Sequence, residues 1–566
     1  MIRHLVVAFA CIAATAISLA QAPGKSLEDP DKAKKPPGNC TVSGRVVGAT
    51  DGAPLRSARV GLIQTSVQRH PLVYATTTDN EGRFEIKQIE AGRYEFFASH
   101  VGYLEQYYQA KSTNEDGALL SLASGLEISD VLFRLVRAAV ITGKVVDDTG
   151  EPMVGVSISV LGKLSTEDLE EAGPRARKQE LISVSAGLTD DRGEYRIFGL
   201  KHGEYYVKAA ATADPPIAGR VEMGSNWILL HQLGSQYAPL YYPGVLPMDQ
   251  AQAVTLSAGE EAQADFAMRR IKVVQVSGRV IGVDGSPATH AYAALSVPNV
   301  NDWGDGLGTS VDSRGEFSIK GVPPGSYVLT VRQNDEGQHS SARQKVEVGE
   351  ESIDSIVIAI GRGAKLHGYV TASVVGTAAL DRVYVVLGST SEDEAAGGGF
   401  AEVKKDGTFE LDGLPDGSYS LNAFGLEPGW FVKSAHLGND DVFQKGVQIE
   451  NGAVAGRVDI VISNDGAQIE GAVTESDKNQ PLAGVRLLAK PEPETDYDRF
   501  RSPQGVTDQN GHFLLKDVPP GNYKVSAKMP SPGGSTPAIK SEPVAVRVGE
   551  REHRALDIQL KVPNSE

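Results

Sequence analysis

Carboxylates recur at fixed positions in this sequence, and carboxylates can bind calcium or transfer protons. The phrase "TDQNGHFLLKDVPPGNY" from Thr507 returns as "TDNEGRFEIKQIEAGRY" from Thr78, "TDDRGEYRIFGLKHGEY" from Thr189 and "VDSRGEFSIKGVPPGSY" from Val311. A calcium site needs several converging oxygens, whereas this phrase offers one or two. We therefore predict that the aspartate accepts backbone hydrogen bonds within its own turn. The residues concerned are Asp79, Asp190, Asp312 and Asp508.

A fifth, looser copy of the phrase begins at Val403 as "VKKDGTFELDGLPDGSY". Lys404 stands there in place of the aspartate, although Asp406 lies nearby. All five copies keep the turn glycine, even the copy that has lost the aspartate. We therefore interpret the phrase as part of the fold and not as a binding or catalytic site.

Other catalytic chemistry has no support in the spacing of residues. No histidine stands in an H-x-x-E or H-E-x-x-H motif, so no zinc site of those types is encoded. The chain also lacks a G-x-S-x-G nucleophile elbow and a G-x-x-x-x-G-K-[ST] phosphate loop. The acidic run "STEDLEEAG" from Ser165 is typical of a solvated charge run. We predict a protein that is not an enzyme and has no metal and no cofactor.

Composition and the first residues indicate export and several domains. The 566 residues exceed what one core can organise, and the formal net charge of -17 excludes nucleic acid as a partner. A basic start at Arg3 and an apolar run from Leu5 to Ala20 predict a signal peptide over residues 1–20, with a lipoprotein at Cys11 as the alternative. No later stretch is apolar enough to span a membrane. Residues 21–39 read as a polar linker, and Cys40 is then the single thiol of the mature chain, incidental or able to cross-link two chains.

The repeats predict one small all-β fold made five times. Each unit opens with a strand that has a central glycine: "VSGRV" at Val42, "ITGKV" at Ile141, "VSGRV" at Val276, "LHGYV" at Leu366 and "IEGAV" at Ile469. A turn with proline follows in four units and is missing from the fourth, whose first turn should differ. After the aspartate turn comes an alternating strand, and a tyrosine stands 12 residues beyond each turn glycine. This fixed interval predicts a hairpin that ends in a tyrosine corner, whose hydroxyl bonds back to the backbone.

Together, the G-x-P turn, the D-x-x-G-x-[FY]-x-[IL] strand and the closing P-P-G-x-Y resemble the carboxypeptidase regulatory-like domain. That family is a small transthyretin-like, Ig-like β-sandwich, which is also grouped with carbohydrate-binding-like folds and adhesin repeats. The resemblance covers residues 40–562 and implies an accessory domain without the peptidase. We expect five tandem β-sandwiches at residues 40–136, 137–270, 271–362, 363–465 and 466–562.

Residues that break the repeat are the better candidates for binding. The second unit carries an insertion, "GSNWILLHQLGSQYAPLYYPGVLP", in which exposed aromatic rings could stack on sugars. The alternative is that this insertion covers a sheet edge, with Pro239 and Pro243 blocking further pairing. The candidate ligand-binding residues are Trp227, Tyr237, Tyr241, Tyr242, Trp303 and Trp430.

These observations favour a non-catalytic, exported binding or display protein of the periplasm, cell surface or medium. A polysaccharide or an envelope protein is the expected partner, and the oligomeric state stays open. One alternative is a stalk or adhesin that makes protein contacts. A second is an accessory subunit of a separate hydrolase or outer-membrane transporter.

Overall fold

The computed structural model describes residues 38–562, with gaps inside that range. The gaps are residues 66–70, 112–116, 164–180, 212–236, 238, 247, 270–271, 283–284, 297–299, 302–306, 336–337, 362, 374–379, 381, 391–397, 428, 451, 455, 495–501 and 530–537. The predicted signal peptide, most of the linker, the "STEDLEEAG" run and the first turn of the fourth unit lie outside the described residues. In the part that is described, no helix has the length and apolar character needed to cross a membrane.

The chain forms five tandem β-sandwiches, as predicted, and each encloses its own buried core. Each sandwich, here called domains 1 to 5 in chain order, has two sheets. One sheet is built around the first strand of the repeat and the other around the strand that carries the corner tyrosine.

The strands of the first three domains are as follows. Domain 1 pairs β4 (Arg83–Ile89), β1 (Cys40–Gly48) and β8 (Glu127–Leu135) in one sheet, and β3 (Val73–Thr77), β2 (Arg59–Gln64), β5 (Gly92–Ser99), β6 (Gln106–Tyr107) and β7 (Leu120–Leu122) in the other. Domain 2 has β12 (Glu194–Leu200), β9 (Ala139–Val146), β16 (Glu261–Gln263) and β17 (Phe266–Ala267), facing β14 (Leu240–Tyr241), β13 (Gly203–Ala210), β10 (Ser157–Lys163), β11 (Leu181–Leu188) and β15 (Val254–Leu256), with the 3-10 helix η3 (Met248–Gln250) between β14 and β15. Domain 3 has β22 (Glu316–Val322), β18 (Val274–Gly282) and β25 (Ile353–Ile360), facing β21 (Leu307–Ser310), β19 (Ala291–Ser296), β23 (Gly325–Asp335) and β24 (Gln338–Val348). A further short strand of domain 3, β20 (Val300–Asn301), pairs with β11 of domain 2.

Domains 4 and 5 repeat this order. Domain 4 has β29 (Thr408–Leu414), β26 (Ala364–Ala372), β34 (Val458–Ser463), β31 (Phe431–Leu437) and β32 (Asp440–Asp441), facing β28 (Gly399–Glu402), β27 (Tyr384–Ser389), β30 (Gly417–Phe424) and β33 (Val447–Ile449), and the short helix α3 (Val442–Lys445) follows β32. Domain 5 has β38 (His512–Val518), β35 (Ala467–Glu475), β42 (His553–Ala555) and β43 (Ile558–Leu560), facing β37 (Gln504–Val506), β36 (Arg486–Pro491), β39 (Gly521–Met529), β40 (Ile539–Lys540) and β41 (Val544–Val548).

In every domain the first strand pairs antiparallel with the strand after the aspartate turn and parallel with the last strand. The ladder to the last strand shifts its register, breaks or begins at the central glycine. A Cβ at Gly278 would overlap the carbonyl oxygen of Ile356, and Gly44, Gly143 and Gly471 face a carbonyl in the same way. The central glycine is therefore needed for a close approach of two backbones.

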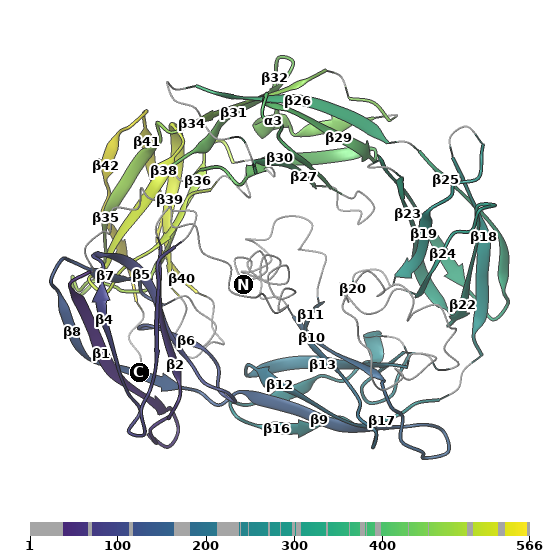
Figure 1. The fold of residues 1–566 in the computed structure, drawn as a ribbon, viewed down its shortest axis with the longest axis horizontal. Coiled ribbons are helices and arrows are strands. Elements are labelled where there is room, and N and C mark those ends of the chain that lie inside the picture. Colours follow the sequence, from purple (N-terminus) through teal and green to yellow (C-terminus); the bar gives the residue numbers. More distant parts are fainter. Residues whose placement is uncertain are drawn as a thin grey trace, which may run out of the picture.

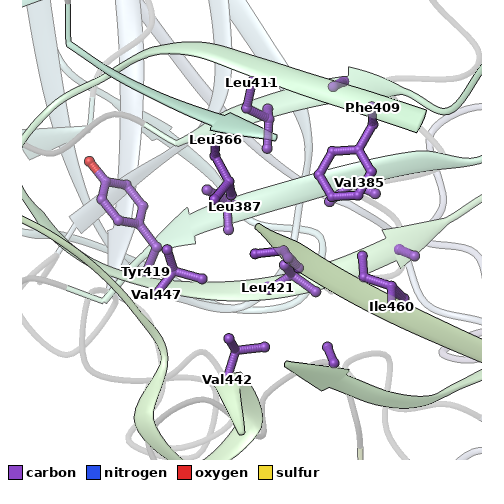
Figure 2. Packing of buried hydrophobic residues seen from close by; sticks show 14 of the residues in the cluster. Leu366, Val385, Leu387, Phe409, Leu411, Tyr419, Leu421, Val442, Val447 and Ile460 are labelled. Atoms are coloured by element: carbon purple, nitrogen blue, oxygen red, sulfur yellow. The ribbon is translucent and has the colours of Figure 1, made fainter. Parts of the chain in front are cut away.

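The predicted tyrosine corner is present five times. The hydroxyl donates to the backbone carbonyl four residues earlier, over 2.7 Å from Tyr94 to Glu90, 3.0 Å from Tyr205 to Lys201, 3.1 Å from Tyr327 to Pro323, 2.7 Å from Tyr419 to Pro415 and 2.7 Å from Tyr523 to Pro519. In Figure 2 the ring of Tyr419 lies at one end of the domain 4 core, beside Val447, and its hydroxyl points away from Leu421. The bond therefore satisfies the one polar atom that the buried ring carries into the core.

The five domains lie around a ring, so that domain 5 comes to rest against domain 1 (Figure 1). In each domain the sheet built on the first strand lies toward the outside of the ring, and the sheet with the tyrosine strand lies toward its centre (Figure 1). We call these the outer and the inner sheet. Neighbouring domains are also joined by polar contacts, such as that of Lys433 in domain 4 with Glu550 in domain 5 (2.6 Å).

Cys40 is fully buried in the core of domain 1, and its sulfur donates to the carbonyl of Ala123 over 3.1 Å. This thiol is therefore shielded from a second chain in the folded domain.

Replacing Gly278 with alanine should destabilise domain 3 by roughly 2–3 kcal/mol, because the new methyl group must displace the β25 backbone. Hydrogen exchange of the full chain, followed in peptides from β18 and β25, measures the change. Gly349→Ala in the same domain is the control, since no atom lies within 4 Å of its added Cβ. Equal exchange in the two variants would contradict the close-approach explanation.

High pH should weaken domains 3 and 4 through their corner tyrosines. Burial raises the pKa of Tyr419 to about 12, and Asp416 adds to the shift. Burial also raises the pKa of Tyr327 to about 12. Because the ordinary value is about 10, the stabilising effect of the neutral hydroxyl is complete below pH ~10 and is lost as the pH rises to ~12. Urea unfolding between pH 8 and 12 measures this loss, and Tyr419→Phe should make domain 4 less sensitive to pH in that window.

Candidate functional site

The repeated aspartates are turn caps. Oδ1 of Asp312 accepts from the backbone N–H groups of Arg314 and Glu316, each over 2.8 Å, and Asp79, Asp190 and Asp508 accept from the same two positions of their own turns. These bonds hold the pKa of Asp312 and of Asp190 below the ordinary value. In domain 4, Asp406 takes over by accepting from the backbone N–H and the hydroxyl of Thr408. Among the described residues there is no group of three or more acidic, histidine or cysteine side chains that could hold a metal ion.

A buried threonine hydroxyl forms a second set of hydrogen bonds in these turns, which the sequence did not predict. The threonine before the aspartate is buried in domains 1, 2 and 5, and its hydroxyl bonds the loop that precedes the second strand. Thr78 accepts from the N–H of Ala58 over 2.9 Å and donates to the carbonyl of Leu55 over 2.5 Å. Thr189 and Thr507 make the same two bonds, whereas domains 3 and 4 have the buried Val311 and Val403 at this position. The repeated "TD" therefore belongs to the architecture as well.

The aromatic residues of the domain 2 insertion pack inward where the structure describes them. Tyr241 is buried with Leu161 and Leu181, and Nζ of Lys208 lies 5.6 Å from the centre of its ring. Tyr242 packs edge-on against Phe266 with ring centres 6.2 Å apart. Tyr237 is half-buried against the same core. These positions fit the alternative in which the insertion covers a sheet edge, because β14 pairs with the edge of β13.

The three tryptophans that are candidate ligand-binding residues do not form one site in the part of the chain that the structure describes. Trp430 is half-buried and packs against the core of domain 4, and its backbone N–H donates to the carbonyl of Glu427 over 2.9 Å. Trp227 and Trp303 lie outside the described residues. Ligand binding by these two therefore stays a prediction.

An exposed aromatic cluster lies instead on the inner sheet of domain 4. Tyr384 on β27 stands directly opposite Phe424 on β30, and Phe400 on β28 stands opposite Val386, two residues along β27 from Tyr384. Tyr384 is 37% exposed, Phe424 40% and Phe400 74%. Because their neighbours Val385, Leu387 and Ala423 are buried in the core, the three rings share the opposite, solvent-facing side of the sheet. We call Tyr384, Phe400 and Phe424 the aromatic face.

Polar side chains complete this surface. Glu402 is opposite Tyr384, and Asn422 is opposite Val386, so both lie on the same side of the sheet as the three rings. Neighbouring strands are about 4.8 Å apart, and residues two apart on one strand are separated by about 6.6 Å. Hydrogen-bonding groups therefore stand within one strand of the rings of the aromatic face. In the sequence, the aromatic face is visible only as aromatic residues at the positions of each strand where an alternating pattern would place polar residues.

Two shallow depressions occupy equivalent places on the outer sheets of domains 2 and 4. One lies over Gly143 and the other over Gly368, the central glycines of the first strands. The depression in domain 4 is lined by His367, Lys404 and Arg457, and Nδ1 of His367 lies 3.3 Å from Glu410. Since the same place is hollow in two repeats with different charges, we attribute the depressions to the glycine that the fold requires.

Comparison with known proteins agrees with this architecture. Residues 41–121 match the family model of the carboxypeptidase regulatory-like domain. No curated protein matches the chain.

Solved structures with similar parts include the Bacillus anthracis TIE protein, at 13% identity and a TM-score of 0.16, covering 72% of this chain and 69% of that one. GBS52, the minor pilin of Streptococcus agalactiae, is 14% identical with a TM-score of 0.22, covering 41% of this chain and 96% of its own. BcpA, the major pilin subunit of Bacillus cereus, is 11% identical with a TM-score of 0.14, covering 75% and 99%. Scores this low carry no argument about function. With its bulged first strand, aspartate turn and tyrosine corner, the segment of residues 41–121 is identified as a carboxypeptidase regulatory-like domain.

Proposed function

We propose that this protein is an exported, non-catalytic binding protein and that the aromatic face of domain 4 binds a carbohydrate chain. The observation that carries the proposal is the set of three exposed rings on one side of one sheet. A large apolar side chain costs free energy when it stays in water, so three together on a folded surface indicate a surface that is covered in use.

The arrangement of the aromatic face favours a sugar over a purely apolar partner. The face of a hexose presents C–H groups that pack on aromatic rings, while its hydroxyls need hydrogen-bonding groups at the edge of the rings. Glu402 and Asn422 lie in those places, next to Tyr384 and Val386. Among the described residues the patch is open, since Phe400 leaves 74% of its surface in water, and an open patch fits a chain of sugars better than a single sugar.

The circular arrangement of the five domains favours a binding protein over the alternative role of a stalk. A stalk places its ends far apart, whereas here domain 5 lies against domain 1 (Figure 1). The inner sheet of domain 4 presents its solvent-facing side, with the aromatic face, toward the centre of this ring (Figure 1). Contact with an envelope protein at the same face is the second candidate, since Phe400 alone leaves 74% of its surface in water.

A polysaccharide and glycan binding screen on residues 21–566 tests the proposal. The wild-type chain should bind a glycan, and the triple variant Tyr384→Ala, Phe400→Ala, Phe424→Ala should bind it about 100-fold more weakly, since each ring contributes roughly 1 kcal/mol. Phe198→Ala is the matched control, because this phenylalanine is 66% exposed on domain 2, away from the aromatic face. A wild-type chain that binds no glycan would refute the carbohydrate assignment and turn the search to protein partners.

Replacing Tyr241 with alanine should affect stability and not binding. Its ring is only 4% exposed, so the change empties a packed site and should destabilise domain 2 by roughly 3 kcal/mol. Hydrogen exchange in β13 and β14 measures this effect, with Phe400→Ala as the exposed control that should change stability by less than about 0.5 kcal/mol. If Tyr241→Ala left exchange unchanged and abolished glycan binding, the insertion and not the aromatic face would be the binding site.

A further inference from the structure

The first and last domains meet through backbone groups. The turn at the start of domain 5's aspartate phrase pairs with the chain just before β7 of domain 1. The N–H of Leu119 donates to the carbonyl of Thr507 over 3.3 Å, and the N–H of Gln509 donates to the carbonyl of Leu119 over 3.2 Å. This is a short piece of parallel ladder between segments almost 400 residues apart in the sequence.

The side chain of Gln509 extends the contact by one more residue. Its Oε1 accepts from the N–H of Ser121 and its Nε2 donates to the carbonyl of Ser121, each over 2.9 Å. A primary amide is the side chain that can accept and donate in this way at once. Gln509 therefore replaces a strand neighbour for Ser121.

A sheltered ion pair lies beside this ladder. Nη2 of Arg93 lies 3.4 Å from Oδ2 of Asp508 and donates to the carbonyl of His512 over 3.1 Å. The Arg93 side chain is 24% exposed and that of Asp508 5%. Salt screens such a pair less than a pair on the open surface. Nζ of Lys111 also lies 2.9 Å from the sulfur of Met529.

The other repeats provide an internal comparison. Asp79, Asp190, Asp312 and Asp406 are all exposed, and so are the residues at the position of Gln509, which are Asn80, Asp191, Ser313 and Lys405. Only in domain 5 is the aspartate buried and the next residue half-buried. A buried carboxylate without a partner is costly, and Arg93 provides the partner. The turn of domain 5 thus keeps the architecture of the repeat and adds a docking surface to it.

We propose that the turn of residues 507–512 and the segment of residues 118–121, with Arg93, form a lock that keeps the mature chain a closed, monomeric ring in solution. The contact joins two different surfaces, so it closes a ring within one chain or links separate chains end to end. Four covalently connected junctions bring the two surfaces together in one molecule (Figure 1), which gives them a high effective concentration and favours closure within the chain.

Small-angle X-ray scattering of residues 21–566 at several concentrations tests the lock. The wild-type radius of gyration should be that of a ring and independent of concentration. The double variant Arg93→Ala, Gln509→Ala should open, and its radius of gyration should rise by up to about 1.8-fold, the ratio for a thin ring that is cut and straightened. The matched control Asn80→Ala, Arg314→Ala removes an amide and a guanidinium from exposed turns and should leave scattering unchanged.

A second variant separates opening from unfolding. Gln509→Lys places a charge in the lock but suits the turn itself, because Lys405 has this position in domain 4. It should raise the radius of gyration while hydrogen exchange in β38 and β39 stays as in the wild type. A wild-type chain that is already extended or dimeric would overturn the proposal, and so would two lock variants that scatter like the wild type. Glycan binding is not read in this experiment, so its outcome is independent of the proposed function.

Discussion

In four of the five sandwiches the last strand, or the backbone beside it, passes so close to the first strand that only glycine fits at the centre of the first strand. The carbonyl oxygens of Val131, Ala264, Ile356 and Leu556 lie where a side chain of the first strand would begin, and in domain 4 the ring of Phe409 takes that place. This close approach ties the two ends of a domain of about 100 residues into one sheet. The core, the hairpin and the tyrosine corner are then built between strands whose separation is already set.

The features that the sequence predicts well are local. The glycine stands three positions after the aspartate, and the corner tyrosine bonds four residues back, so spacing alone is enough to assign their roles. The hydroxyl of Thr78 was missed because its partners Leu55 and Ala58 precede it by 20 residues or more. Nothing in a single strand reveals such a contact. The same holds for the pairing of Gln509 with Ser121, which are 388 residues apart.

The candidate site shows the same division between local and distant information. The sequence makes Tyr241 and Tyr242 candidate ligand-binding residues, because four aromatic residues stand in one insertion. In the folded chain both rings pack against other side chains. Tyr384, Phe400 and Phe424 come from three strands, and each looks ordinary in its own segment. Their meeting depends on register, since a shift of one residue would turn a ring from the solvent side into the core. Residues that break a repeat are therefore good candidates only when their direction is known.

Closure also constrains how such a chain can change in evolution. An open row of repeats can gain or lose a unit at either end with little consequence for the units that remain. In this ring a duplication would separate Asp508 from Arg93 unless every junction changed its angle. The number of domains is therefore set by the geometry of the ring. Related chains should differ in their loops far more often than in the number of their domains.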